Sequence, residues 1–293
     1  MEKIEIIVAS HKIFDDSILP KGYQVVKVGN KVSDDEAKDH GYQTDNEGEN
    51  ISFQNPWYCE LTAHYWAWKN LKCDICGLVH YRRYFMSNKL SARAFKDDIL
   101  TEAQIKNILN RYKVIVPYFA PKHNDTMTLH KGMSKDKDNR DWVIFENIIK
   151  KYYPEILPSF NKIVYSSVAW GLNMIITTKS VFDEYSMFLF DVLGKWDKEL
   201  EKRGIVRRPR VDGYYSETLM CVWIMAKFHE YEIYRNDVRN LESDENANYY
   251  SMSIKSILKR AIKSIHCFNN IIHKVYLYKH YRPVEKLPHA SID

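Results

Sequence analysis

Residues 77–85 read GLVHYRRYF, and this stretch decides the fold class. The apolar run from Gly77 to Val79 stops at His80, and two arginines and three aromatic rings surround or follow that point. A short apolar run bounded in this way is typical of a buried strand. In open α/β sheets, ligands bind beyond the carboxyl ends of the strands. GLVHYRRYF therefore predicts a central strand with an anion-binding loop directly after it.

Two earlier apolar runs end in the same way. Residues 3–9 are rich in Ile and Val and stop at Ser10-His11-Lys12, and residues 24–28 stop at Gly29-Asn30. If the three strands are neighbours in a parallel sheet, their polar ends converge on one crevice. The sequence therefore predicts a single ligand site built from three strand ends.

Strand-like and helix-like patterns alternate along the rest of the chain. This alternation predicts an α/β, Rossmann-type domain with a mostly parallel central sheet. Two polar stretches, 33–52 and 120–140, are expected to be loops, the second one mobile, and Asn55 is expected to cap the helix that begins at Pro56. Further strands are expected at 114–116, 173–177 and 232–234, and helices at 56–70, 102–112, 141–152, 180–203 (broken near Gly194) and 212–229.

The charge of the chain is uneven. The net charge is +5, yet residues 251–293 hold eight Lys or Arg against two acidic residues, and the first 250 residues hold 35 basic and 36 acidic ones. The neutral body disfavours a nucleic-acid-binding surface. We expect a catalytic domain at 1–250 and a separate basic tail at 251–293.

The tail also has a helical apolar pattern. Its apolar residues recur at helical spacing, and its lysines occupy the other side, so the pattern predicts a basic amphipathic helix on an anionic membrane surface. The alternative is a helix packed on the main domain with solvated lysines. The apolar positions are Ile254, Ile257, Leu258, Ala261, Ile262 and Ile265.

The five cysteines, without a recognisable signal peptide, indicate reduced thiols in a cytoplasm. No apolar run approaches the roughly 18 to 20 residues of a transmembrane helix. Cys73 and Cys76 form a Cys-x-x-Cys pair, but a zinc site needs about four ligands and no second pair is present.

Arg82 and Arg83 suit a phosphate or a diphosphate, because a guanidinium is planar, permanently charged and able to bind two oxygens at once. The alternative is that these arginines pair with acidic residues such as Asp74 or Asp45 at the surface. In a strand, moreover, one of two consecutive side chains points away from the site.

Further candidate ligand groups surround these arginines. His11, Lys12 and His80 follow strands and are candidate anion donors, although each could equally serve as an ordinary structural or solvated side chain. Asp45, Asn46 and Asn50 can bond sugar hydroxyls, although turns favour the same residue types.

A second cluster, Arg210-Val-Asp-Gly-Tyr-Tyr-Ser-Glu217, opens a helix. A carboxylate at this place, Glu217 or Asp212, is a candidate general base. The alternative is that Asp212 caps the helix and Glu217 complements its dipole. The sequence leaves both interpretations open.

Common nucleotide and hydrolase motifs are absent, including Gly-x-Gly-x-x-Gly, the P-loop and Gly-x-Ser-x-Gly. The Asp-x-Asp that metal-dependent sugar-nucleotide transferases usually carry after an apolar strand is absent too, since His80-Tyr81-Arg82 stands there. We therefore assign no metal ligand. Mg²⁺ or Mn²⁺ stays an option, and arginines could neutralise a leaving diphosphate instead.

Several long blocks resemble a bacterial family. VASHK, DNEGENIS, NPWYCELTAHYWAWKN, GLVHYRRYF, NMIITTKSVFDEY and RVDGYYSE occur in this order between about residues 4 and 235. Together they resemble a family of capsular and exopolysaccharide glycosyltransferases that was long filed as a domain of unknown function, some members of which are linked to galactofuranose transfer.

The resemblance implies a GT-A-like domain that binds a nucleotide sugar. The candidate positions that lie in the matching blocks are His11, Lys12, Asp45, Asn46, Asn50, His80, Tyr81, Arg82, Arg83, Asn173, Arg210, Asp212 and Glu217. The resemblance assigns no individual role to any of them.

The resulting hypothesis is a cytoplasmic glycosyltransferase that is peripheral on the inner face of the plasma membrane. It would move a sugar from a nucleotide diphosphate, most simply UDP, to a lipid-linked saccharide. The base and ribose would lie near the first two strand loops and the diphosphate near Lys12, Arg82 and Arg83. An inverting enzyme would need Glu217 or Asp212 as base, whereas a retaining one would not. The rivals are a sugar-phosphate transferase of the same pathway and a non-catalytic carbohydrate-binding or scaffold protein.

Overall fold

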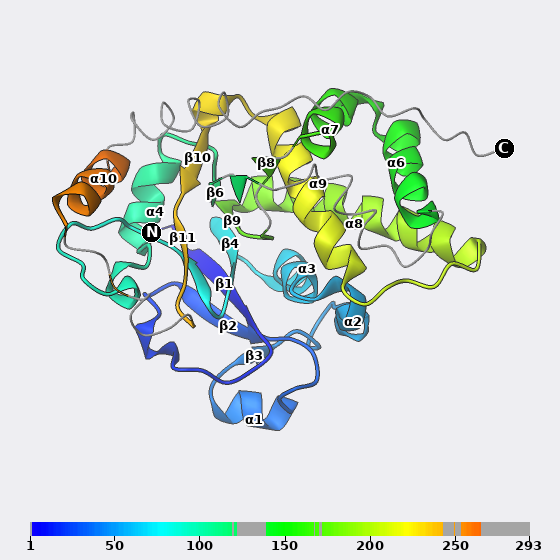
Figure 1. Cartoon of the computed structure of the whole chain (residues 1–293). Helices are drawn as coiled ribbons and strands as arrows, with labels where there is room; N and C mark the ends of the chain where they lie inside the picture. The colour runs from blue at the N-terminus through cyan, green and yellow to red at the C-terminus, as the bar shows by residue number, and fades with distance from the viewer. Residues whose placement is uncertain are drawn as a thin grey trace.

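The computed structural model describes residues 2–118, 120–121, 139–166, 168–169, 172–242, 249 and 253–264. Within these residues the chain forms a nine-stranded mixed sheet flanked by helices (Figure 1). Its strands are β1 (Ile4–Ser10), β2 (Tyr23–Lys27), β3 (Gln43–Thr44), β4 (Ile75–His80), β5 (Arg83–Phe85), β6 (Val114–Pro117), β9 (Ile175–Thr178), β10 (Ile233–Asn236) and β11 (Val238–Asn240). A separate small sheet pairs β7 (Ala120–Pro121) with β8 (Val168–Ala169).

The main path of the sheet runs β10-β6-β9-β4-β1-β2-β3. The pairs β1–β2, β1–β4, β2–β3 and β6–β10 are parallel, and β9 runs antiparallel between β4 and β6. This arrangement confirms the predicted α/β fold with a mostly parallel sheet. Because Ala9 pairs with His80 and Ser10 with Lys27, the carboxyl ends of β1, β2 and β4 lie level with one another.

Both faces of the sheet are buried, which explains why its strands are continuously apolar rather than alternating. Along β1, Ile7 and Ala9 join one core, and Ile6 and Val8 join the other. The first core is formed with α3 (Leu61–Asn70), α6 (Arg140–Tyr152), α7 (Leu157–Val164), α8 (Lys179–Lys202) and α9 (Val211–Lys227). The second core includes residues of α4 (Glu102–Leu109) and of the short helix Phe95–Asp98.

Four predicted local features are wrong, three of them in the extent or continuity of a loop or a helix. The loop expected at 33–52 contains α1 (Asp34–Asp39) and strand β3. Helix α8 runs unbroken through Gly194. The helix expected at 56–70 is two helices, α2 (Asn55–Tyr58) and α3, because Cys59 adopts a left-handed φ of 52° between them.

Asn55 is likewise not the cap of this segment. It lies inside α2, and its side-chain amide donates to the Cys59 carbonyl at 2.9 Å and to Thr62 Oγ1 at 3.2 Å. Asn55 thus stabilises the break between the two helices. Of the loop expected at 120–140, residues 122–138 lie outside the described residues.

The predicted tail helix is present as α10 (Ile254–Ser264). Its apolar residues Ile254 and Leu258 are 79% and 56% exposed. Residues 265–293, including Ile265, lie outside the described residues. The division at residue 250 and the membrane role of the tail stay predictions.

Gly77 of the opening motif allows close packing at the centre of the sheet. A Cβ at this position would lie 2.7 Å from Ile176 Cγ1, 2.9 Å from the Ile175 carbonyl oxygen and 2.9 Å from Ile6 Cδ1. We expect Gly77→Ala to lower the free energy of unfolding by about 1 to 3 kcal/mol, because strand β4 is held on both sides and cannot move away. Denaturant titration measures the effect.

Gly194→Ala is the matched control. No atom lies within 4 Å of a Cβ at Gly194, and the residue is inside α8. Alanine there is expected to be neutral or to stabilise by up to about 1 kcal/mol. Equal effects of the two substitutions would contradict the packing explanation.

Candidate active site

A cavity of 570 Å³ lies beyond the level strand ends. It takes residues from all three polar clusters that follow β1, β2 and β4, so the predicted convergence is confirmed. It is closed on the other side by the start of α2, by the break between α2 and α3, and by the start of α9. We call it the main cavity; its lining includes His11, Gly29, Asn30, Lys31, Asn55, Pro56, Cys59, Glu60, His80, Tyr81, Arg82, Arg83, Leu172, Arg210, Tyr214 and Glu217.

A tight turn after β4 places both arginines at the main cavity. His80 pairs with Arg83 across the β4–β5 hairpin, so Tyr81 and Arg82 form the turn between them. Arg82 and Arg83 therefore do not lie on opposite faces of one strand, and both line the cavity. Neither arginine pairs with Asp74 or Asp45, and among the described residues Arg83 has no ion pair.

The two histidines lie in a positive, partly desolvated environment. Burial lowers the pKa of His11, and the neighbouring charges of Lys31, Lys12 and Arg82 lower it further. Burial also lowers the pKa of His80, whose Nε2 is buried without a hydrogen-bond partner among the described residues. A ligand acceptor would satisfy this atom.

The break between α2 and α3 carries a carboxylate into the cavity. Glu60 follows Cys59 and lines the cavity wall. Asn173, which is fully buried, donates to Glu60 Oε1 at 2.7 Å and to the Gly213 carbonyl at 3.0 Å. Asn173 is therefore placed behind the site, where it ties Glu60 to the first turn of α9. Burial raises the pKa of the Cys59 thiol to about 11, so this group stays neutral.

One face of α9 and the residue before it provide three lining residues. Arg210, Tyr214 and Glu217 stand at i, i+4 and i+7, which is one face of a helix. The Arg210 backbone has a φ of 64°, and its N–H donates to the Pro56 carbonyl at 2.9 Å. The Arg210 guanidinium lies 5.4 Å from the Tyr214 ring centroid. The backbone hydrogen bond from Arg210 to Pro56 joins the start of α9 to the start of α2, so these two parts of the cavity wall are held together.

Asp212, the second predicted base, does not reach the main cavity. Its carboxylate is fully buried, and Arg207 Nη1 lies 3.6 Å from its Oδ2. Burial and the adjacent Asp197 raise the pKa of Asp212 well above its usual range. Asp197 in turn accepts from Tyr58 at 2.8 Å and from Arg207 at 2.7 Å. The structure thus places Asp212 in a packed network behind α2.

Asp45, Asn46 and Asn50 do not line the cavity either. Asp45 is buried, and burial raises its pKa to about 6. The Asn46 side chain donates to Asp34 Oδ2 at 2.6 Å, and that of Asn50 to the carbonyls of Asn46 at 3.0 Å and Gly48 at 2.9 Å. These contacts organise turns, which is the simpler of the two interpretations of this stretch.

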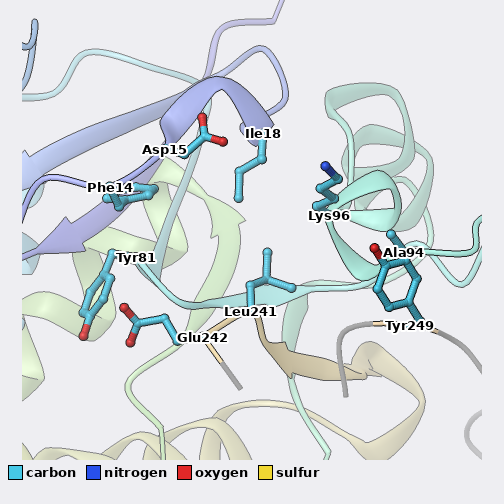
Figure 2. A pocket seen from close by; sticks show the side chains of 9 residues that line it. All are labelled: Phe14, Asp15, Ile18, Tyr81, Ala94, Lys96, Leu241, Glu242 and Tyr249. Carbon is cyan, nitrogen blue, oxygen red and sulfur yellow. The ribbon is translucent and has the colours of Figure 1, made fainter. Parts of the chain in front are cut away.

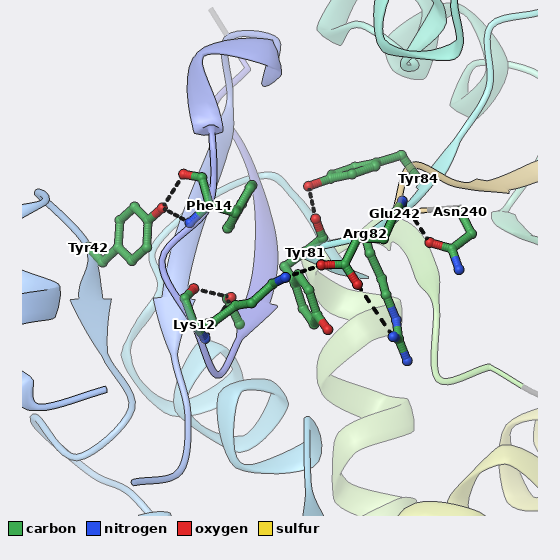
Figure 3. Close-up of polar contacts among 9 residues, drawn as sticks. Lys12, Phe14, Tyr42, Tyr81, Arg82, Tyr84, Asn240 and Glu242 are labelled. Carbon is green, nitrogen blue, oxygen red and sulfur yellow. Dashed lines mark hydrogen bonds and ion pairs between the residues drawn. The ribbon is translucent and has the colours of Figure 1, made fainter. Parts of the chain in front are cut away.

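Lys12 lies at the rim, outside the main cavity. Its Nζ binds Glu242, whose other carboxylate oxygen lies 3.4 Å from Arg82 Nη1 (Figure 3). Lys12 Nζ is also 5.1 Å from the centroid of the Tyr81 ring. The predicted cationic rim is therefore present, but an acidic side chain of the protein occupies part of it.

Two lining groups of chemical interest were not predicted. Lys31 lies between the strand-end residues Gly29-Asn30 and the loop expected at 33–52, and belongs to neither prediction. Glu60 was not predicted because the sequence indicated one continuous helix at 56–70, without the break that brings this side chain to the cavity. The i, i+4, i+7 spacing of Arg210, Tyr214 and Glu217 is the signal that could have separated Glu217 from Asp212.

The main cavity combines cations with two carboxylates. Lys31, Arg82, Arg83 and Arg210 provide fixed positive charge, and Glu60 and Glu217 provide candidate bases. No group of three or more His, Cys, Asp or Glu that could hold a metal ion occurs in the described part of the chain. The residue types at the strand ends suit an anionic ligand with hydroxyl groups.

The comparisons agree with this fold. The chain is similar to a solved apo structure of WbbM, a bifunctional glycosyltransferase, with a TM-score of 0.64 and 22% identity. The match covers 82% of this chain and 46% of that one, so the chain spans about half the length of the protein it matches. The fold is therefore GT-A-like: a Rossmann-type domain with a mostly parallel sheet.

Residues 5–230 match the family model described as a domain of unknown function, DUF4422. The chain belongs to this family, which confirms at the family level the resemblance seen in the sequence. No curated protein matches the chain.

Proposed function

We propose that the protein is a glycosyltransferase that uses a nucleotide-diphosphate sugar. The observation that carries the proposal is the main cavity, a space of 570 Å³ at the carboxyl ends of β1, β2 and β4 that is lined by several fixed cations and two carboxylates. The GT-A-like fold and the glycosyltransferase name of the structural neighbour support it.

The proposed reaction divides the lining residues into two groups. Arg83, with Arg82 at the rim, holds the diphosphate and stabilises the negative charge that grows as it leaves. Glu217 accepts the proton of the acceptor hydroxyl while that oxygen bonds to the anomeric carbon. The bond from this carbon to the phosphate oxygen breaks, and its electron pair leaves with the diphosphate. Glu60 is the second candidate for the base.

We further propose UDP as the nucleotide and a lipid-linked saccharide as the acceptor, in capsule, exopolysaccharide or O-antigen synthesis. The sequence resemblance supports these assignments, and it supports a hexosyl donor such as galactofuranose. The protein would work in the cytoplasm, at the inner face of the plasma membrane. No helix in the described ranges is long and apolar enough to cross a membrane.

A thermal-shift screen of nucleotides and nucleotide sugars, with and without Mn²⁺, tests the proposal. UDP and one UDP-sugar are expected to stabilise the protein by about 2.7 kcal/mol at about 100 times Kd. Incubation with an acceptor should then release UDP. Release of UMP would instead identify a sugar-phosphate transferase, and binding of saccharide without any nucleotide would identify a non-catalytic protein.

The tail prediction is tested by deletion of residues 251–293. We expect the shortened protein to lose at least about tenfold in affinity for vesicles containing phosphatidylglycerol, since each cation near an anionic surface contributes about 1 kcal/mol. Turnover on a soluble acceptor analogue should not change. Vesicles of phosphatidylcholine alone are the control. Unchanged sedimentation with the anionic vesicles would mean that the tail packs on the domain.

A further inference from the structure

Glu242 occupies the cationic rim between two strand ends. It follows β11, which pairs with β5, and the Leu241 N–H donates to the Arg82 carbonyl at 2.7 Å. The Glu242 N–H donates to Asn240 Oδ1 at 3.1 Å. These backbone contacts hold Glu242 beside the β4–β5 turn, so its carboxylate reaches both Lys12 and Arg82 (Figure 3).

Lys12 and Arg82 form a site of the kind that binds an anion, and a carboxylate of the same protein, that of Glu242, occupies it. Lys12 follows β1 and Arg82 follows β4, and these two strands are parallel neighbours. A carboxylate between two such cations presents oxygens as a phosphate would. The side chains of Lys12, Arg82 and Glu242 are 44%, 37% and 33% exposed, so the ion pairs are solvated and weak enough to exchange.

A second cavity lies on the other side of Glu242. We call it the rim cavity; its volume is 350 Å³, and Figure 2 shows its lining. Phe14, Ile18, Tyr81 and Leu241 form apolar parts of its wall, and three charged residues, Asp15, Lys96 and Glu242 itself, also line it. Tyr81 lines both cavities, so they adjoin at this residue.

The rim cavity, the ion pairs of Glu242 and the main cavity are arranged in the order of the nucleoside, the diphosphate and the sugar of a nucleotide sugar. A base is flat and partly apolar with polar edges, which suits aromatic walls with a few polar groups. The diphosphate that comes next suits Lys12 and Arg82. The sugar, rich in hydroxyls, suits the main cavity with its carboxylates. The middle position is the one that Glu242 occupies.

We propose that the Glu242 carboxylate holds the place of the donor diphosphate in the ligand-free protein, and that the rim cavity receives the nucleoside when the donor displaces it. This inference rests on the proposed function. Glu242 would thereby set the affinity for the donor, because the apparent Kd of a site that is open only part of the time is its intrinsic Kd divided by the open fraction.

Binding of UDP and of inorganic pyrophosphate to the full chain, measured by calorimetry, tests the place-holding role. We expect Glu242→Gln to bind both ligands about five- to tenfold more tightly. Glu242→Asp keeps the charge but shortens the side chain, so it should also bind more tightly. Glu184→Gln, which removes the partner of Lys227 outside both cavities, is the matched control and should change nothing.

Two results would overturn the inference. Unchanged or weaker binding by Glu242→Gln would show that the carboxylate does not compete with the ligand. Tighter binding by Glu242→Gln together with wild-type binding by Glu242→Asp would show that Glu242 acts through the repulsion of its negative charge and does not occupy the position of the ligand.

Ile18→Trp tests the nucleoside part, since the larger indole ring would extend into the rim cavity and narrow the space for a nucleoside. It should weaken UDP binding at least about tenfold and leave pyrophosphate binding unchanged. Unchanged UDP binding would place the nucleoside elsewhere and overturn this part. If the wild type and Glu242→Gln both bind pyrophosphate but no nucleotide, the proposed function itself is wrong. If Arg83→Ala weakens UDP binding but substitutions of Glu242 and Ile18 do not change it, only this inference is wrong.

Discussion

Glu217→Gln is expected to reduce turnover by about 10²- to 10⁴-fold while donor affinity changes little. The amide has nearly the shape of the carboxylate but cannot accept the proton of the acceptor hydroxyl. Glu217 lines the main cavity on the same face of α9 as Arg210 and Tyr214, so the substitution leaves the packing of the helix intact. Initial rates of UDP release, with donor affinity from calorimetry, separate the loss of chemistry from a loss of binding.

Asp212→Asn is the matched control, because it makes the same chemical change five residues away on the same helix. Asp212 is fully buried and lies outside the cavity, so turnover should stay within about threefold of wild type, as for other residues without contact to the substrate. Glu60→Gln is the competing candidate. A large loss in Glu60→Gln with near-normal turnover in Glu217→Gln would transfer the role of base to Glu60.

The sequence predicted the strand ends well because their signal is local. In each case an apolar run changes to polar residues at one position, and the parallel pairing of β1 with both β2 and β4 brings these positions together. Residue types alone did not show which of Asp212 and Glu217 reaches the site. Helical geometry shows that only one of them can face the cavity, because five residues at about 100° each place them about 140° apart. The spacing from Arg210 and Tyr214 identifies Glu217 as that one.

The features that the sequence did not predict depend on backbone conformation and on tertiary contacts. The break at Cys59 uses a left-handed residue that is not glycine, and it is held by Asn55 and by the contact of Arg210 with the Pro56 carbonyl. Glu242 is separated from Arg82 by 160 positions in the chain, and only the pairing of β5 with β11 brings them together. Neither arrangement leaves a local pattern of residue types.

Arg83→Ala is expected to weaken binding of UDP and of the donor by about 10- to 100-fold, which corresponds to one or two charge-assisted hydrogen bonds of about 1.5 to 3 kcal/mol in total. Arg83 lines the main cavity and forms no ion pair among the described residues, so the ligand displaces no salt-bridged carboxylate from it; the charges of Glu217 and Glu60 act on it at longer range. Calorimetry with UDP measures the loss, and Arg203→Ala, which breaks a surface pair with Glu199, is the control.

Arg82→Ala should have a smaller effect than Arg83→Ala, although the two residues are adjacent. Removing Arg82 takes away a ligand contact but also one of the two cations that hold Glu242, so the lost attraction is partly offset by easier access for the ligand. Within the proposed function, the difference between the two variants reports how far Glu242 competes with the diphosphate. Negligible effects of both would show that these arginines do not bind the diphosphate, and equal, large effects would show that Glu242 does not compete.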